Sequence, residues 1–81
     1  MAIPSLDKVV AELRIIAEDD SIVADSKFSD LDIDSLDVLE WVFEIEGQAD
    51  FQIDESLYDE ETLKTATIRV FYERINSAAS A

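Results

Sequence analysis

Apolar side chains recur at helical spacing in three segments of this chain, and this periodicity constrains the fold more than any other feature of the sequence. The segments are residues 6–17, 35–48 and 68–75. In each of them the apolar residues fall three or four positions apart, which is typical of an amphipathic helix that buries one face. No run with a period of two is long enough to indicate a strand. The sequence therefore predicts an all-α fold.

The connecting segments predict where the helices begin and end. Ser5 is a suitable N-cap for the first helix, which is expected to end near Glu18. Gly47, the only glycine, is expected near the end of the second helix, because glycine commonly terminates helices. Residues 19–34 are polar and irregular, and they predict a long loop. Four apolar side chains are expected to hold this loop against the core: Ile22, Val23, Phe28 and Leu31.

The last third of the chain predicts a short helix followed by a long one. Residues 50–58 are expected to form a second loop, and residues 59–63 a short helical turn with acids at its start, where the helix dipole favours them. Thr65 or Thr67 is suited to cap the last helix. The small polar residues 77–81 predict a disordered tail.

With 81 residues, the chain is long enough for one hydrophobic core and too short for two, so residues 1–81 are expected to form a single domain. We predict a small four-helix bundle with three main helices, one short helix and a long first loop. Cysteine and histidine are absent, and no glycine-rich loop is present. These absences remove the usual nucleophile–base pairs and nucleotide cradles, so we expect a non-catalytic protein. No apolar run approaches membrane-spanning length, and a cytoplasmic monomer that does not insert into membranes is expected.

The charge of the chain is strongly one-sided. Twenty acids face six bases, which gives a net charge of −14 and excludes nucleic acid as a natural partner. Thirteen of the acids lie between Lys27 and Lys64, a stretch without any base. One interpretation is a device for solubility. The other is a surface that steers partners carrying basic patches, since a field of one sign raises encounter rates by about tenfold or more.

The segment 35–48 carries apolar residues on two sides of its helix. At about 100° per residue, one side gathers Val38, Trp41, Val42 and Ile45, and we assign these to the core. Nearly opposite lie Leu36, Leu39 and Phe43. One stripe cannot bury both sets, so the second set is interpreted as a contact surface that is at least partly exposed. The alternative is a helix buried almost all round.

The alternating acids Asp30, Asp32 and Asp34 are similar to the start of a calcium-binding loop. An EF-hand loop that begins in this way needs glycine at its sixth position and glutamate at its twelfth. Ser35 and Trp41 stand there instead. No metal site is therefore predicted.

Ser35 is the best candidate for covalent modification. Ser21 and Ser26 also follow an aspartate, but only Ser35 opens a strongly periodic helix with a second apolar stripe. Unpaired backbone N–H groups and the positive end of the helix dipole make a helix start suitable for an attached phosphate. The competing interpretation is that Ser35 is simply the N-cap of this helix.

The residues from Phe28 to Glu46 resemble the acyl carrier protein family. The similarity lies in Phe28, in Asp30 and Leu31, and in the acidic helix that a short motif opens: Asp34, Ser35, Leu36 and Asp37. Helix order and chain length agree with that family over essentially the whole sequence. The resemblance implies that Ser35 carries 4′-phosphopantetheine, transferred from coenzyme A by a separate phosphopantetheinyl transferase. It also implies an acyl chain as cargo, held as a thioester and shuttled between enzymes with basic patches.

The resemblance further assigns a partner surface to the second helix. Asp34, Leu36 and Asp37 would frame the site that the transferase recognises. The surface read by visiting enzymes would continue through four residues: Glu40, Phe43, Glu44 and Glu46. Together with Leu39 these residues give an apolar anchor within a charged rim, which is common interface anatomy. The bundle interior near Val9, Leu13, Ile45 and Ile68 is expected to have room for part of an acyl chain.

Some positions depart from the family pattern. Asp32 stands where the family usually has glycine, Ala49 where it has phenylalanine and Asp54 where it has proline. These differences leave two cargo classes open, a fatty-acid-type carrier and a specialised free-standing carrier for an unusual acyl, polyketide or amino-acid group. The alternative from another functional class is an acidic helical adaptor that binds a basic partner without any prosthetic group.

Overall fold

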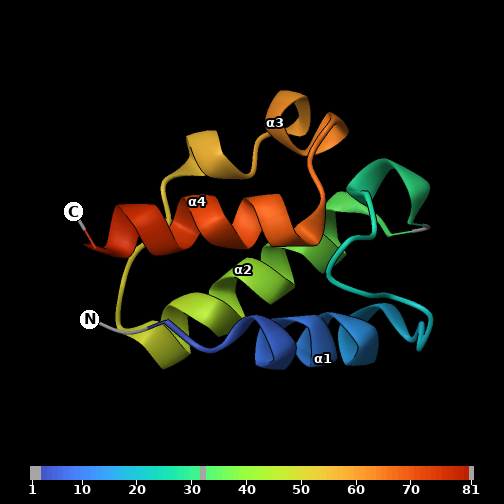
Figure 1. The fold of residues 1–81 in the computed structure, drawn as a ribbon, viewed down its shortest axis with the longest axis horizontal. Helices are drawn as coiled ribbons and strands as arrows, with labels where there is room; N and C mark the ends of the chain where they lie inside the picture. The colour runs from blue at the N-terminus through green and yellow to red at the C-terminus, as the bar shows by residue number, and fades with distance from the viewer. Residues whose placement is uncertain (1–2, 32, 81) are drawn as a thin grey trace.

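The computed structural model describes residues 3–31 and 33–80, and this part of the chain forms four α-helices (Figure 1). The elements, in chain order, are α1 (Leu6–Ala17), the 3-10 turn η1 (Phe28–Asp30), α2 (Ser35–Ala49), the 3-10 turn η2 (Glu55–Leu57), α3 (Glu60–Lys64) and α4 (Ile68–Ser80). α2 runs diagonally between α1 and α4 (Figure 1). No strand is found in the described residues. The predicted all-α bundle of three main helices and one short helix is confirmed.

Helix α1 begins and ends where its sequence predicts. The Ser5 hydroxyl accepts a hydrogen bond from the Lys8 N–H at 3.2 Å, which supplies a partner to one of the free donors of the first turn. The helix stops at Ala17 because Glu18 adopts a left-handed conformation with φ of 55°. None of the described helices is long and apolar enough to cross a membrane.

Helix α2 ends near Gly47, as predicted, but the glycine itself does not terminate the helix. The helix continues to Ala49, and Asp50 takes the left-handed position with φ of 52°. The reason is tertiary packing. Ile45 and Ala49 are both buried on the core side of the helix, and their burial outweighs the roughly 1 kcal/mol that glycine costs inside a helix.

An aromatic cluster at the centre of the bundle joins three elements. The ring centroids of Trp41 and Phe71 lie 5.3 Å apart, and those of Phe28 and Phe71 lie 5.8 Å apart. The Trp41 indole N–H also donates a hydrogen bond to the Val9 carbonyl at 2.8 Å. Burying three aromatic rings in contact contributes both hydrophobic area and about 0.5–1.5 kcal/mol per ring pair. The predicted core set of Val38, Trp41, Val42 and Ile45 is buried as expected.

The long first loop is fastened to the start of α4. The Phe28 N–H donates to the Ala66 carbonyl at 3.2 Å, and the Ile68 N–H donates to the Ser26 carbonyl at 3.1 Å. Ile22 is fully buried, as predicted. Val23 is not, since 49% of it is exposed, so its prediction as an anchor is wrong. These bonds bring η1, just ahead of α2, against the segment that follows α3.

The residues near the C-terminus that the sequence predicted to be disordered are helical. Helix α4 continues through Ser80, whereas the sequence predicted a tail from residue 77, of which Ala81 lies outside the described residues. Ala78 and Ala79 are strong helix formers, and no glycine or proline interrupts the last turn. At the start of the same helix, Thr67 rather than Thr65 acts as the cap, because its hydroxyl accepts from the Val70 N–H at 3.1 Å.

Candidate functional site

Ser35 is the first residue of α2, and Asp34 is its N-cap. The Asp34 carboxylate accepts a hydrogen bond from the Asp37 N–H at 2.9 Å, and the Asp34 carbonyl accepts from the Val38 N–H at 3.2 Å. The sequence left open whether Ser35 capped its own helix. The structure assigns that role to Asp34, so the Ser35 side chain is not needed for capping.

The Ser35 hydroxyl is exposed and available for chemistry. No hydrogen bond to it is found within residues 3–31 and 33–80. The first N–H groups of a helix have no partner within the helix, and of these the Asp34 carboxylate accepts a hydrogen bond only from the Asp37 N–H. A phosphate ester on Ser35 would therefore lie beside free donors and the positive end of the helix dipole, an effect of about 0.3–1 kcal/mol.

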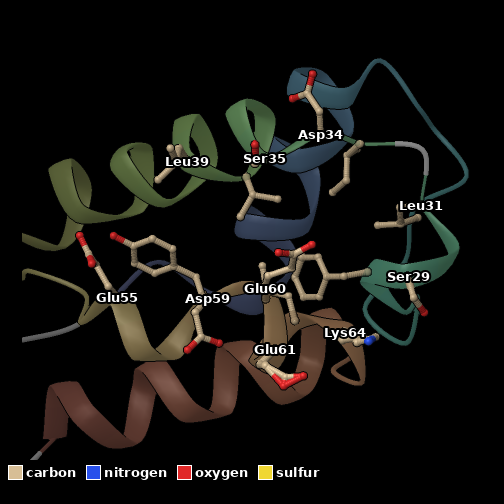
Figure 2. A pocket seen from close by; sticks show the side chains of 15 residues that line it. Ser29, Leu31, Asp34, Ser35, Leu39, Glu55, Asp59, Glu60, Glu61 and Lys64 are labelled. Carbon is tan, nitrogen blue, oxygen red and sulfur yellow. The ribbon is translucent and has the colours of Figure 1, made fainter.

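A groove opens beside Ser35, between α2 on one side and η2 and α3 on the other. Its volume is about 990 Å³, which suits a ligand of moderate size. Figure 2 shows Ser35 and Leu39 along α2, with Asp59, Glu60 and Glu61 along the facing segment. The apolar lining comes from three separate parts of the chain: Phe28, Leu31, Ile33, Val38, Leu39 and Leu63.

The sequence did not predict this groove. It predicted room for part of an acyl chain in the bundle interior instead. Val9, Leu13, Ile45 and Ile68 are at most 1% exposed, and none of them lines the groove. They fill the packed centre instead. Tyr58 and Leu63, which do line the groove, carried no sequence signal, because a groove assembled from distant segments leaves no local period.

The residues predicted as a partner surface do not all lie on the open side of α2. Leu36 and Phe43 are 72% and 59% exposed, and Glu40 and Glu44 are also exposed, so these four share the open side of α2. Leu39 is half-buried and faces the groove. The prediction that the second apolar stripe is at least partly exposed is thus confirmed for all three members, of which Leu39 is the least exposed.

Glu46 is the member whose position differs most. It is half-buried, and one carboxylate oxygen accepts a hydrogen bond from the Ile53 N–H at 2.6 Å. This bond holds the loop that follows α2 against the helix. The Asp34 carboxylate likewise has a structural role, as the cap of α2, in addition to its place beside the predicted attachment residue.

Within residues 3–31 and 33–80, the alternating acids before α2 do not form a metal site. Asp32 lies outside the described residues. Among the described residues no group of three or more histidine, cysteine, aspartate or glutamate side chains is placed to hold a metal ion.

Two comparisons with known proteins return a match to this chain. The family model described as "Phosphopantetheine attachment site" matches residues 6–74. The chain is also 32% identical over 79 residues to a Brassica napus protein named "Acyl carrier protein, chloroplastic", covering 98% of this chain and 56% of that protein. The chain thus spans about half the length of this curated relative. No solved structure matches it.

The chain belongs to the acyl carrier protein family, whose members contain a phosphopantetheine attachment domain. Its prosthetic group is accordingly 4′-phosphopantetheine, and a domain of this kind is a carrier rather than a catalyst. The residues present fit that group. The start of α2 presents an exposed serine hydroxyl beside free N–H donors, and a groove with an apolar lining begins at the same residue.

Proposed function

We propose that the chain carries acyl or related groups as thioesters on a 4′-phosphopantetheine arm attached to Ser35, and passes them between biosynthetic enzymes. The observation that carries this proposal is the arrangement at the start of α2. Asp34 caps the helix, and the adjacent Ser35 hydroxyl is exposed, without a partner in the described structure. When bound, the group supplies the terminal thiol that a chain without cysteine lacks.

The attachment step requires only a free hydroxyl from this chain. Ser35 Oγ forms a bond to the phosphorus next to the pantetheine in coenzyme A and gives up its proton. The bond from that phosphorus to the bridging pyrophosphate oxygen breaks, and adenosine 3′,5′-bisphosphate leaves. The chain has no histidine to accept the proton, so the base comes from the phosphopantetheinyl transferase.

The charge of the surface supports delivery by an enzyme rather than direct reaction. Coenzyme A is a polyanion, and Ser35 lies between Asp34 and Asp37 with Glu40 one turn further along α2. Free coenzyme A is repelled by these carboxylates, whereas an enzyme with a basic patch is attracted to them and brings its substrate along. The exposed Leu36 and Phe43 offer such an enzyme an apolar anchor.

Intact-mass spectrometry tests the proposal. The protein is incubated with coenzyme A and a broad-specificity phosphopantetheinyl transferase, and wild type is expected to gain the mass of one phosphopantetheine. Ser35→Ala is expected to gain none. Ser29→Ala is the matched control, because Ser29 is an exposed serine that lines the same groove, and it is expected to react like wild type. An unmodified wild type would favour the adaptor alternative.

Charge reversal tests the partner surface separately. Asp37→Lys with Glu40→Lys is expected to slow transfer by tenfold or more, roughly the gain that electrostatic steering gives. Asp20→Lys with Glu73→Lys makes the same change in net charge at exposed positions outside α2. Equal transfer rates for the two double variants, with the helix content intact in both, would contradict recognition at α2.

A further inference from the structure

A second hollow lies between α1, the first loop and α4. Its volume is about 370 Å³, which is within the size range of small-ligand sites. None of its lining residues also lines the groove beside Ser35. The described lining consists of two arginines, two aspartates and three aliphatic residues: Arg14, Arg69, Asp7, Asp25, Val10, Val23 and Ala24. The charges of this lining therefore cancel, in a chain whose net charge is −14.

Both arginines of the hollow are held in place by hydrogen bonds to the first loop. Arg14 Nε donates to the Ile22 carbonyl at 2.6 Å, and Arg69 Nε donates to the Asp25 carboxylate at 2.8 Å. The Arg69 backbone N–H also donates to the Ala24 carbonyl at 2.8 Å. No hydrogen bond from the terminal Nη groups of either arginine is found among the described residues. Each guanidinium is thus oriented by its Nε and keeps further donors for a ligand.

Carboxylates and aliphatic side chains complete the hollow. Asp7 is exposed, and no hydrogen bond to its carboxylate is found in the described part of the chain. The hydrogen bond to Asp25 raises the pKa of the Arg69 guanidinium most, and the negative charge of Asp7 adds to the rise, so Asp7 lies near that guanidinium. Val10 is 5% exposed and Val23 is 49% exposed, so the apolar lining extends from the core to the surface.

This combination of charges selects a chemical class of ligand. A simple anion would be attracted by the two guanidiniums but repelled by Asp7 and Asp25, in a chain that is strongly negative overall. A simple cation would be attracted by the aspartates but repelled by Arg14 and Arg69. A ligand with one negative and one positive group satisfies both pairs. An aliphatic part of the same ligand would cover the apolar lining, which favours binding.

We propose that this hollow binds a small zwitterion with an aliphatic side chain, of the amino-acid type. The ligand carboxylate accepts hydrogen bonds from the Nη groups of Arg14 and Arg69, and the ligand ammonium group donates to Asp7. The aliphatic side chain of the ligand lies against Val10 and Val23. The site is separate from the proposed attachment residue, and binding there does not depend on the prosthetic group.

Amide NMR spectra of the full chain test the proposal with three ligands of one carbon skeleton. Leucine carries both charged groups, isocaproate lacks the ammonium group and isopentylamine lacks the carboxylate. Leucine is expected to shift the amide signals of Val23, Ala24 and Arg69 until they saturate. It is expected to bind about tenfold or more tightly than either analogue, because each analogue loses a charge-assisted hydrogen bond. Signals of Phe43 and Glu44, on the open side of α2, are the internal reference and are expected to stay unchanged.

Two pairs of variants assign the charged groups. Arg69→Gln is expected to weaken leucine binding by about tenfold or more, whereas Arg74→Gln removes an exposed base of the same helix outside the hollow and is expected to leave binding unchanged. Asp7→Asn is expected to weaken leucine binding without weakening isocaproate binding. Its matched control is Asp20→Asn, at an exposed position outside the hollow. Because no described hydrogen bond uses the Asp7 carboxylate, this variant keeps the test valid if Arg69→Gln loses its fold.

Each contrary result overturns a stated part of the inference. If leucine up to about 0.1 M moved none of the three loop and α4 signals, there would be no site, and the arginines would only fasten the first loop. Equal affinity for leucine and isocaproate would refute the zwitterionic class and the role of Asp7. Equal affinity for leucine and isopentylamine, or undiminished binding by folded Arg69→Gln, would refute the role of the arginines. The mass gain that tests phosphopantetheine attachment is a separate measurement, so either proposal can fail alone.

Discussion

The assignment of capping to Asp34 rather than Ser35 predicts opposite consequences for two neighbouring substitutions. Asp34→Ala removes the acceptor for the Asp37 N–H and is expected to cost about 1 kcal/mol of unfolding free energy, within a range of roughly 0.5–2. It also removes a negative charge from the helix start, which adds about 0.3–1 kcal/mol. Ser35→Ala removes a hydroxyl without a described partner, so its cost is expected to stay within about 0.5 kcal/mol.

Thermal unfolding of the unmodified proteins, followed by far-UV circular dichroism at equal ionic strength, measures the difference. For a domain of this size about 1 kcal/mol corresponds to roughly 4–8 °C, so the summed cost for Asp34→Ala is expected to lower its melting temperature by about 5–16 °C relative to wild type. Ser35→Ala is expected to melt within about 3 °C of wild type. Asp34→Asn keeps a capping acceptor and is expected to fall between them. If Ser35→Ala lost as much stability as Asp34→Ala, the hydroxyl would be serving the helix, and the reasoning about its availability would be refuted.

Three further predictions concern stability. Gly47→Ala is expected to raise the unfolding free energy by about 0.8–1 kcal/mol, because an added Cβ meets nothing within 4 Å in a regular helix; a lower melting temperature would contradict this. Tyr72→Phe loses the hydrogen bond to the Pro4 carbonyl and is expected to lower the unfolding free energy, measured in urea, by about 0.5–1.5 kcal/mol. Tyr58→Phe is expected to be nearly neutral, because no hydrogen bond to the Tyr58 hydroxyl is found among the described residues; equal losses for the two variants would contradict this. Raising NaCl from about 0.01 M to about 0.15 M shortens the Debye length from ~30 to ~8 Å, so the melting temperature of this chain with a net charge of −14 is expected to rise; a constant value would show that self-repulsion is small.

The helices could be predicted from the sequence because each buries a stripe that its own residues define. The spacing of Leu6, Val9 and Leu13, or of Ile68, Phe71 and Ile75, fixes a face without reference to the rest of the chain. The same local pattern predicted the exposure of Leu36 and Phe43 on the second side of α2.

The errors lie where contacts between distant segments decide the structure. Val23 is apolar, but the loop around it is fixed by hydrogen bonds to the start of α4, and its side chain remains half exposed. Gly47 lies near the end of α2 as expected, but core packing carries the helix two residues beyond it. The choice between Asp34 and Ser35 as cap depends on one residue of register, which composition does not determine, since both side chains are competent caps. The groove combines η1, α2, η2 and α3, and no single segment signals it.

Peptide mapping of the modified protein tests the central claim most directly. After reaction with coenzyme A and the transferase, the protein is digested and the fragment ions of the peptide that spans the start of α2 are sequenced by mass spectrometry. The account predicts that phosphopantetheine is found on Ser35 in the modified protein. Its attachment to Ser29, or to any other serine of the chain, would contradict the account, as would the absence of modification from a protein whose fold is intact.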